Sequence, residues 1–363
     1  MSKKLTFEGP LNSLSLGNVS LNFLRELSES DNLHSVFPVG DRAELEAYDK
    51  LDDEFKSKLV SLAQNRIKDY DASIPVLRCW HINGAERKVA NDQYLYTFYE
   101  TDSPTLEELR IVSQQKHTFF SSSMAANLFK ESGLDNVSYV PLGFDPDFGK
   151  LENSRKLDDD IIHFGLAGKL ELRKNTQKII KIWLEKFGNN PKYQLTCLIN
   201  NPFFKPELYN EILQKTLGGT RWSNISFLPH LKTNGEVNQF INSIDVDLSG
   251  LSSGEGDNLP ARNATSIGKW SIVTNCSAHV DWATADNSIL VEPNGTRPCY
   301  DNMFFNEGGP FNQGSFFNIE DDAIRDGMDR AVKKAKTENT NGLKLQERTY
   351  RKTIDSILKE IQK

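Results

Sequence analysis

The chain has 363 residues, of which 38% are hydrophobic and 26% charged, and its formal net charge is −7. This length allows roughly two domains with a sizeable buried core, and the composition excludes a wholly disordered chain, a collagen and a coiled coil. The acidic balance gives no support to nucleic-acid binding, which is usually accompanied by a basic excess or a basic stripe.

Short apolar runs alternate with helical patterns along the first 140 residues, which is typical of βα units. Strands are expected at Leu5–Phe7, Ser35–Val39, Pro75–Cys79, Tyr94–Phe98, Thr118–Ser121 and Val137–Val140. Helices are expected at Val19–Leu27, Thr105–Gln115 and Ser123–Glu131. Residues 9–17 are expected to form a loop after the first strand, because Gly, Ser and Asn are frequent there.

Residues 141–159 contain turn residues and charges without periodicity, so they are the predicted linker. A second βα series follows. Its strands are expected at Ile161–Leu166, Gln194–Ile199, Ile225–Leu228, Val246–Leu248, Ser271–Thr274 and Ser288–Val291. Its helices are expected at Thr176–Phe187, Lys205–Leu217, Asn234–Ile241, Leu259–Ile267, Asp321–Ala335 and Leu343–Ile361. Residues 294–315 are expected to be a surface loop.

This order of elements predicts an α/β protein with two Rossmann-like, doubly wound domains that face each other across a cleft. The first domain is expected over residues 1–150 and the second over residues 157–340. Ligands of such sheets bind beyond the carboxyl ends of the strands. The loops at residues 9–17, 100–104, 168–174 and 250–259 are therefore the candidate binding loops.

The four cysteines lie far apart and form no C-x-x-C pair, which excludes a disulfide framework and a zinc site of the usual spacing. No apolar run approaches the ~20 residues of a membrane span, and no apolar segment of a signal peptide follows the first lysines. We therefore expect a cytoplasmic protein with no transmembrane segment.

The loop that leads into the helix at 176–187 carries three cations, Lys169, Arg173 and Lys174. The free N–H groups and the dipole of a helix N-terminus attract anions. The spacing of these cations fits a diphosphate site. It fits equally well a helix start whose positive charges are simply solvated.

The segment at 249–260 also follows a strand, and glycines in it allow a ligand to approach the backbone. Glu255 in this segment would repel a phosphate and suits sugar hydroxyls, unless it is an exposed loop acid. Gly250 to Gly254 match the G-x-S-x-G pattern around Ser252. A hydrolase is disfavoured because no helix starts directly after Ser252 and only His279 follows it among histidines.

Three longer segments, in order along the chain, resemble the family 4 retaining glycosyltransferases of the GT-B fold. Thr118–Phe148 resembles the family's last N-terminal strand-helix-strand unit, which ends in a V-x-P-x-G-x-D run. Phe164–Phe187 resembles its G-[RK]-x-x-x-[RK]-K-[GN] loop with the following helix. Leu248–Gly268 resembles its S-x-x-E-G-x-x-L-P-x-x-E-A segment. The resemblance covers most of residues 90–300.

The resemblance implies transfer of a sugar from a nucleoside-diphosphate sugar with retention of anomeric configuration and without an obligatory metal ion or other cofactor. Lys169 and Lys174 would be catalytic, with Arg173 beside them, because they would neutralise the departing diphosphate. Glu255 would hold the hydroxyl groups of the donor sugar. Further donor contacts are expected from Gly17, Gly256, Asp257, Asn258, Leu259 and Asn263.

Two positions depart from the family pattern. Asn263 replaces the family's second glutamate, which normally accepts hydrogen bonds from the nucleotide ribose; an Asn carbonyl can still accept one. Where many members have a histidine after the N-terminal strand, this chain has Phe98, Tyr99 and Glu100. Glu100 and His81 are expected on the acceptor side, although Glu100 equally suits a helix cap and isolated histidines are mostly structural.

The resemblance also implies that the last helix, at about 343–363, packs back on the first domain and that the domains close by a hinge at 145–158. An inactive relative that binds a nucleotide-sugar or a glycan is the main alternative, because of Asn263. The acceptor is left open among a glycan, a lipid, a protein and a modified DNA base.

Overall fold

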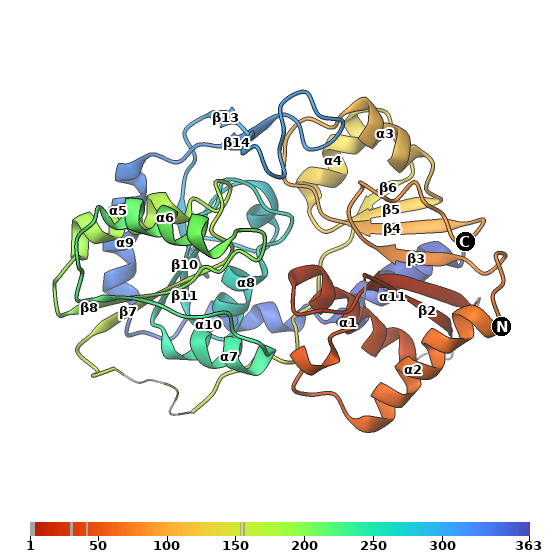
Figure 1. Ribbon diagram of the computed structural model, residues 1–363, viewed down its shortest axis with the longest axis horizontal. Helices are drawn as coiled ribbons and strands as arrows, with labels where there is room; N and C mark the ends of the chain where they lie inside the picture. The colour runs from red at the N-terminus through yellow and green to blue at the C-terminus, as the bar shows by residue number, and fades with distance from the viewer. Residues whose placement is uncertain (1–3, 30–31, 41–42, 153, 155–156) are drawn as a thin grey trace.

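The computed structural model describes residues 4–29, 32–40, 43–152, 154 and 157–363. It contains two parallel six-stranded sheets with flanking helices, one sheet in each half of the chain (Figure 1). The α/β class with two doubly wound sheets is thereby confirmed. Residues 1–3 of the first predicted domain, and residues 153, 155 and 156 of the predicted linker and hinge, lie outside the described residues.

The first sheet has the strand order β2-β1-β3-β4-β5-β6. Its strands are β1 (Leu5–Pro10), β2 (Leu33–Val39), β3 (Val76–Cys79), β4 (Gln93–Thr97), β5 (His117–Phe120) and β6 (Val137–Tyr139). The helices of this half are α1 (Ser15–Glu29), η1 (Leu45–Ala47), α2 (Asp53–Lys68), α3 (Leu106–Ser113) and α4 (Ser123–Glu131). The sequence did not predict α2, since only Leu59 and Leu62 of it are buried and its apolar pattern is weak.

The second sheet has the strand order β12-β11-β10-β7-β8-β9. Its strands are β7 (Ile162–Ala167), β8 (Tyr193–Leu198), β9 (Ile225–Phe227), β10 (Val246–Gly250), β11 (Trp270–Thr274) and β12 (Ile289–Val291). Its helices are α5 (Thr176–Phe187), α6 (Pro206–Leu217), α7 (Asn234–Ser243), α8 (Leu259–Ser266), η2 (Ser277–Asp281) and α9 (Asp321–Lys334). The predicted surface loop at 294–315 includes β13 (Thr296–Pro298), which pairs with β14 (Ser315–Phe317) in an antiparallel ribbon.

Helix α5 shows how the sequence sets these elements. Ile179, Ile180, Trp183 and Phe187 recur at helical spacing and all enter the core of the second half. Parallel strands are buried on both faces, and every residue of β1, β10 and β11 is accordingly buried. The two sheets therefore have separate cores. The contact between the halves involves the loops at the carboxyl ends of their strands.

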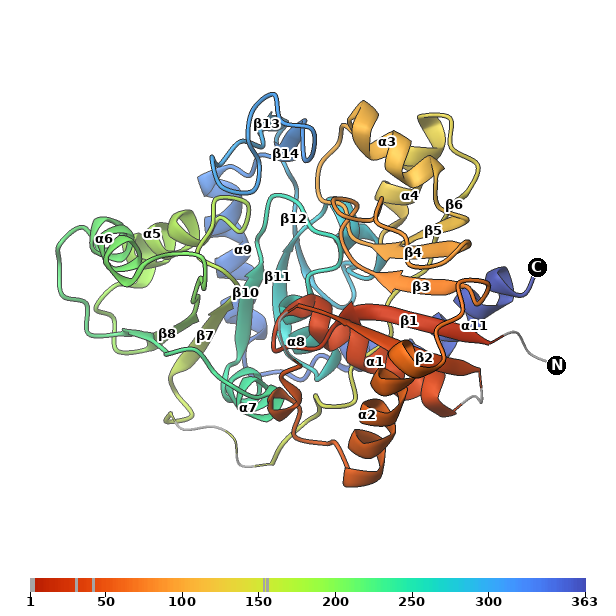
Figure 2. The ribbon, with the colours of Figure 1, turned by 45° about the vertical axis from the view of Figure 1, so that its right-hand side comes forward.

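The end of the chain returns to the first half. The single helix expected over 343–361 is instead α10 (Thr340–Leu343), η3 (Lys344–Glu347) and α11 (Tyr350–Ile361). The break falls where the Thr349 hydroxyl accepts the Lys352 N–H and caps α11. Buried side chains of α11 belong to the core of the first half, and Tyr350 packs edge-to-face on Phe23 of α1 with ring centroids 6.0 Å apart. Figure 2 shows α11 beside α1.

Loops at the carboxyl ends of the two sheets touch. The Ser121 hydroxyl donates to the Gly256 carbonyl at 2.6 Å, and a Cβ on Gly256 would lie 2.7 Å from Cβ of Phe98. A Cβ on Gly254 would lie 2.5 Å from the Glu100 carbonyl oxygen. The loop after β10 therefore meets the loops after β4 and β5, with room for glycine alone at the closest points. Among the described residues, no helix is both long enough and apolar enough to cross a membrane.

Candidate functional site

The loop between β7 and α5, residues 168–175, is bonded to the loop after β10, and Asn175 makes two of these bonds. Asn175 has a left-handed backbone with φ 53°, a conformation that Asn adopts more readily than most residues. Its amide Nδ2 donates to the Leu251 carbonyl at 3.0 Å and to the Ser253 hydroxyl at 2.8 Å. The two predicted binding loops thus form one unit at the carboxyl edge of the second sheet.

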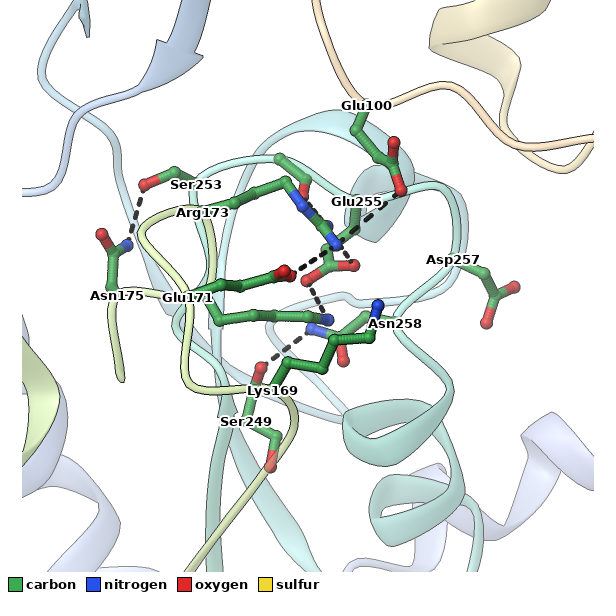
Figure 3. Close-up of polar contacts among 12 residues, drawn as sticks. Glu100, Lys169, Glu171, Arg173, Asn175, Ser249, Ser253, Glu255, Asp257 and Asn258 are labelled. Carbon is green, nitrogen blue, oxygen red and sulfur yellow. Dashed lines mark hydrogen bonds and ion pairs between the residues drawn. The ribbon is translucent and has the colours of Figure 1, made fainter. Parts of the chain in front are cut away.

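Glu255 lies at the centre of this unit and is 4% exposed. Its carboxylate accepts from Lys174 Nζ at 2.6 Å and from Arg173 Nη1 at 2.9 Å (Figure 3). Burial alone would raise the pKa of Glu255, but Lys174 and Arg173 hold it at about 2. Glu255 is therefore a carboxylate at neutral pH, and the alternative of an exposed loop acid is wrong.

Arg173 is surrounded by three carboxylates. Besides Glu255, its guanidinium contacts Glu171 at 3.0 Å and, across to the first half, Glu100 at 3.8 Å. Figure 3 shows these side chains converging on the guanidinium. Although burial opposes the charge, the three carboxylates raise the pKa of Arg173. Its charge is thus already compensated inside the protein.

Lys169 has a different environment. Its ammonium lies 5.2 Å from the ring centroid of Phe203 and 5.3 Å from that of Phe304, which is the range of a cation–π contact. Burial lowers the pKa of Lys169, and the neighbouring Arg173 and Lys174 lower it further. The three cations predicted from the sequence therefore lie close together. Arg173 and Lys174 share Glu255, whereas Lys169 contacts two aromatic rings.

The side chains of two residues expected near the donor, Asp257 and Asn258, have partners within the protein. Asp257 points away from the cluster in Figure 3 and forms an ion pair with Arg262 Nε at 3.0 Å. The Arg262 guanidinium also donates to the carbonyls of Leu142 and Gly143 in the linker. Burial raises the pKa of Asp257 to about 6, against the effect of Arg262. This pair joins the loop after β10 to the linker.

Asn258 directly precedes α8 and has a left-handed backbone, with φ 71°. Its Nδ2 donates to the Ser249 carbonyl and to His279 Nε2, both at 2.9 Å. His279 in turn donates from Nδ1 to the Thr274 carbonyl at 2.8 Å. Burial lowers the pKa of His279 to about 4, so its ring is neutral and supports the loop. Leu259 packs partly buried against the core of the first half.

The remaining predicted residues are Asn263, His81 and Gly17. Asn263 of α8 is 4% exposed, and its Oδ1 has no hydrogen-bond partner among the described residues. His81 is exposed, but the protein around its ring displaces water and so lowers the pKa of the ring. The charges of Lys169 and Arg173 lower this pKa further, whereas Glu100 raises it. Gly17 is buried in the first turns of α1, where a Cβ would lie 2.1 Å from the Asn12 carbonyl oxygen.

Sequence reasoning missed four contributors: Glu171, Asn175, Phe203 and Phe304 all touch the predicted cations or their loops. Glu171 and Asn175 lie inside the 168–175 loop, so its composition offered a signal. Phe203 and Phe304 come from distant loops, and no local pattern relates them to Lys169.

No protein-family model matches the chain, and no curated protein sequence is similar to it. Several solved structures are similar over nearly its whole length. Sucrose-phosphate synthase from Thermosynechococcus elongatus is 12% identical with a TM-score of 0.68, covering 98% of this chain and 97% of the other. HepE from Anabaena, solved with UDP and glucose, is 13% identical with a TM-score of 0.67 and 99% coverage of both chains. Trehalose 6-phosphate synthase from Burkholderia multivorans is 10% identical with a TM-score of 0.64, covering 99% and 98%.

Two facing Rossmann-like halves with this topology define the GT-B fold, which the chain shares with these structures. The GT-B architecture expected from the sequence is therefore confirmed.

Proposed function

We propose that this protein is a glycosyltransferase that moves a sugar from a nucleoside-diphosphate sugar to an acceptor, with retention of anomeric configuration. The observation that carries the proposal is the pairing of buried Glu255 with Lys174 and Arg173, beside Lys169, at the carboxyl edge of a parallel sheet that faces a second sheet. Anion-binding cations and a hydroxyl-binding carboxylate are the two chemistries that a sugar diphosphate needs. The GT-B fold, and a similar structure that contains UDP and glucose, support this reading.

The contacts indicate how a donor would enter. Arg173 is already neutralised by carboxylates, so Lys174 and Lys169 are the cations that a diphosphate would engage. Lys174 would exchange Glu255 for a phosphate oxygen, and the released carboxylate would accept hydrogen bonds from sugar hydroxyls. A donor that offers both groups restores every bond that it breaks, whereas a free sugar leaves Lys174 and Glu255 paired with each other. Donor binding should therefore depend on the diphosphate.

During transfer, negative charge grows on the departing nucleoside diphosphate. Fixed cations aimed at that charge stabilise the transition state more than the ground state. In the proposed mechanism Lys169 and Lys174 fill this role without an obligatory metal ion, and Glu255 orients the sugar. Glu100 and His81 belong to the first half of the chain and would lie toward the acceptor.

The first experiment is calorimetric titration with UDP, GDP and ADP, because a ligand of the donor class should bind through its diphosphate. Lys174→Ala should weaken binding at least tenfold, since a charge-assisted hydrogen bond contributes about 1.5–3 kcal/mol. Lys181→Ala is the matched control, because this exposed lysine lies on α5, the helix that follows the loop of Lys174. Equal affinities of the two variants would contradict the proposed site.

An inactive binding protein is the second candidate, and Asn263 is the observation that favours it. Asn263 offers the ribose one neutral acceptor where the family has a carboxylate, and this buried Oδ1 has no partner within the described part of the chain. Release of nucleoside diphosphate from a bound nucleotide-sugar separates the two candidates. Tight binding with no release, with or without a panel of acceptors, would favour the binding protein.

A further inference from the structure

A segment of the second half reaches across to the first half. Residues 299–315, the strap, run from β13 to the start of α3 and return to β14; the strap occupies the top of Figure 1, between the two halves. Thr105 Oγ1 donates to the Pro310 carbonyl at 2.6 Å, and the Ser315 N–H donates to Asp102 Oδ1 at 2.7 Å. Ser103 and Gln313 form an antiparallel bridge. The strap is therefore built onto the N-terminal end of α3.

One anchor of the strap is a buried carboxylate. Glu108 is 1% exposed and closes the capping box of α3 by accepting the Thr105 N–H at 2.8 Å. The same side chain accepts the Tyr99 hydroxyl at 3.0 Å and the Asn312 N–H of the strap at 2.8 Å. A strap that left α3 would leave this buried carboxylate one donor short, which is costly.

Asn312 bonds in two directions. Its backbone N–H is held by Glu108 of the first half, and its Nδ2 donates to the Phe304 carbonyl at 3.2 Å. The ring of Phe304 lies against the Lys169 ammonium and meets Phe203 edge-to-face, with centroids 5.0 Å apart. A single residue thus joins α3 of one half to the aromatic pair beside a cation of the other half.

We propose that Asn312 is a positioning residue that holds Phe304 against Lys169 only while the strap is seated on α3. Separation of the two halves removes the Asn312 N–H from Glu108, so that Asn312 no longer fixes the Phe304 carbonyl. Asp301 still holds the N–H groups of this turn, but the Phe304 ring moves and Lys169 loses one of its two rings. The phosphate site thereby senses whether the halves are closed. This consequence for the donor rests on the proposed function, whereas the coupling between α3 and Lys169 does not.

The test reads the surroundings of Lys169 directly. Reductive methylation with ¹³C gives dimethyl-lysine signals that keep their positive charge, and the Lys169 signal is assigned by its absence in Lys169→Arg. Two phenyl rings close to the ammonium should shift this signal upfield of the exposed lysines. Binding of UDP is measured in parallel by calorimetry.

Asn312→Gly keeps the N–H to Glu108 and tolerates the left-handed backbone, φ 57°, but loses the bond to Phe304. Asp102→Ala removes the acceptor of the Ser315 N–H and so loosens the strap from the N-terminal end of α3. The two rings beside Lys169, those of Phe203 and Phe304, are themselves unchanged by this substitution. Both variants should move the Lys169 signal toward those of exposed lysines and weaken UDP binding about fivefold, the equivalent of one hydrogen bond. Asn302→Gly is the matched control, because Asn302 is an exposed strap residue with φ 58°, and it should change neither.

The outcomes separate the two proposals. An unmoved Lys169 signal in both Asn312→Gly and Asp102→Ala, with melting temperatures that show folded protein, would overturn the coupling. A signal that moves as expected in a protein that binds no nucleoside diphosphate would support the coupling and count against the proposed function.

Discussion

Replacement of Arg173 by Met should destabilise the second half of the protein by about 3–5 kcal/mol, the usual cost of removing one partner from a buried ion pair. Arg173 is 8% exposed and Glu255 4%. The change deletes the 2.9 Å contact with Glu255, the 3.0 Å contact with Glu171 and a 2.6 Å bond to the Gly254 carbonyl. Lys174 still pairs with Glu255, which places the expected loss near the lower limit.

Urea unfolding followed by tryptophan fluorescence measures this loss. Four of the five tryptophans belong to the second half and report on it: Trp183, Trp222, Trp270 and Trp282. Arg221→Met is the matched control, because this exposed arginine should change stability by less than about 0.5 kcal/mol. Adding Glu255→Gln to Arg173→Met should recover part of the loss, since it removes one of the three carboxylates that have lost Arg173.

The reasoning would be refuted by a loss below about 1 kcal/mol in Arg173→Met. Strict additivity of Arg173→Met and Glu255→Gln would refute it too, because residues that share a buried ion pair interact energetically.

Burial raises the pKa of Asp247 from 3.8 to about 6, so the folded state holds a proton that the unfolded state releases; its contribution to stability is full below pH 4 and is lost as the pH rises through about 6. Asp247→Asn should flatten that slope in unfolding measured from pH 4 to 8, with a gain of up to about 3 kcal/mol above pH 6. Ser252→Ala should leave nucleotide-sugar turnover intact and stability equal or higher, because this buried hydroxyl has no partner among the described residues; lost turnover would revive the hydrolase reading. Gly256→Ala places a Cβ 2.7 Å from Phe98 and should separate the halves, which small-angle scattering detects as a larger radius of gyration. Asn263→Glu should tighten UDP binding in calorimetry if α8 faces the ribose, and unchanged affinity would place the ribose elsewhere.

The sequence predicted most strands and helices because apolar residues recur at the spacing of each element. The helix Thr176–Phe187 was predicted with its observed bounds, since its apolar face is strong and Gly188 follows it. Helix α2 was missed because it buries little, and the last helix was predicted too long because the pattern continues through the turn before Thr349. Apolar periodicity in the sequence reflects burial. Elements that bury few residues, or that follow one another closely, are therefore not predicted from it.

The candidate site was predicted as a set of loops, and its internal pairing was not. Proximity in sequence made Lys169, Arg173 and Lys174 one group, but the structure gives two of them carboxylate partners and the third a pair of rings. The role of Asp257 could not be inferred from its position, because its partner Arg262 is directed by the linker. Such contacts depend on the relative placement of the two halves, which no local pattern encodes.

The position of α11 has a consequence for the order in which the protein is made. Tyr350, Ile354 and Ile357 complete the core beneath the first sheet, yet they follow the core residues of the second half along the chain and are synthesised after them. The second half, whose core uses residues up to Ala335, can form during synthesis. The half that emerges first must therefore keep an apolar face exposed until residues 350–361 have been synthesised. A stop codon in place of Tyr350 would therefore damage the amino-terminal half while sparing the core of the other half.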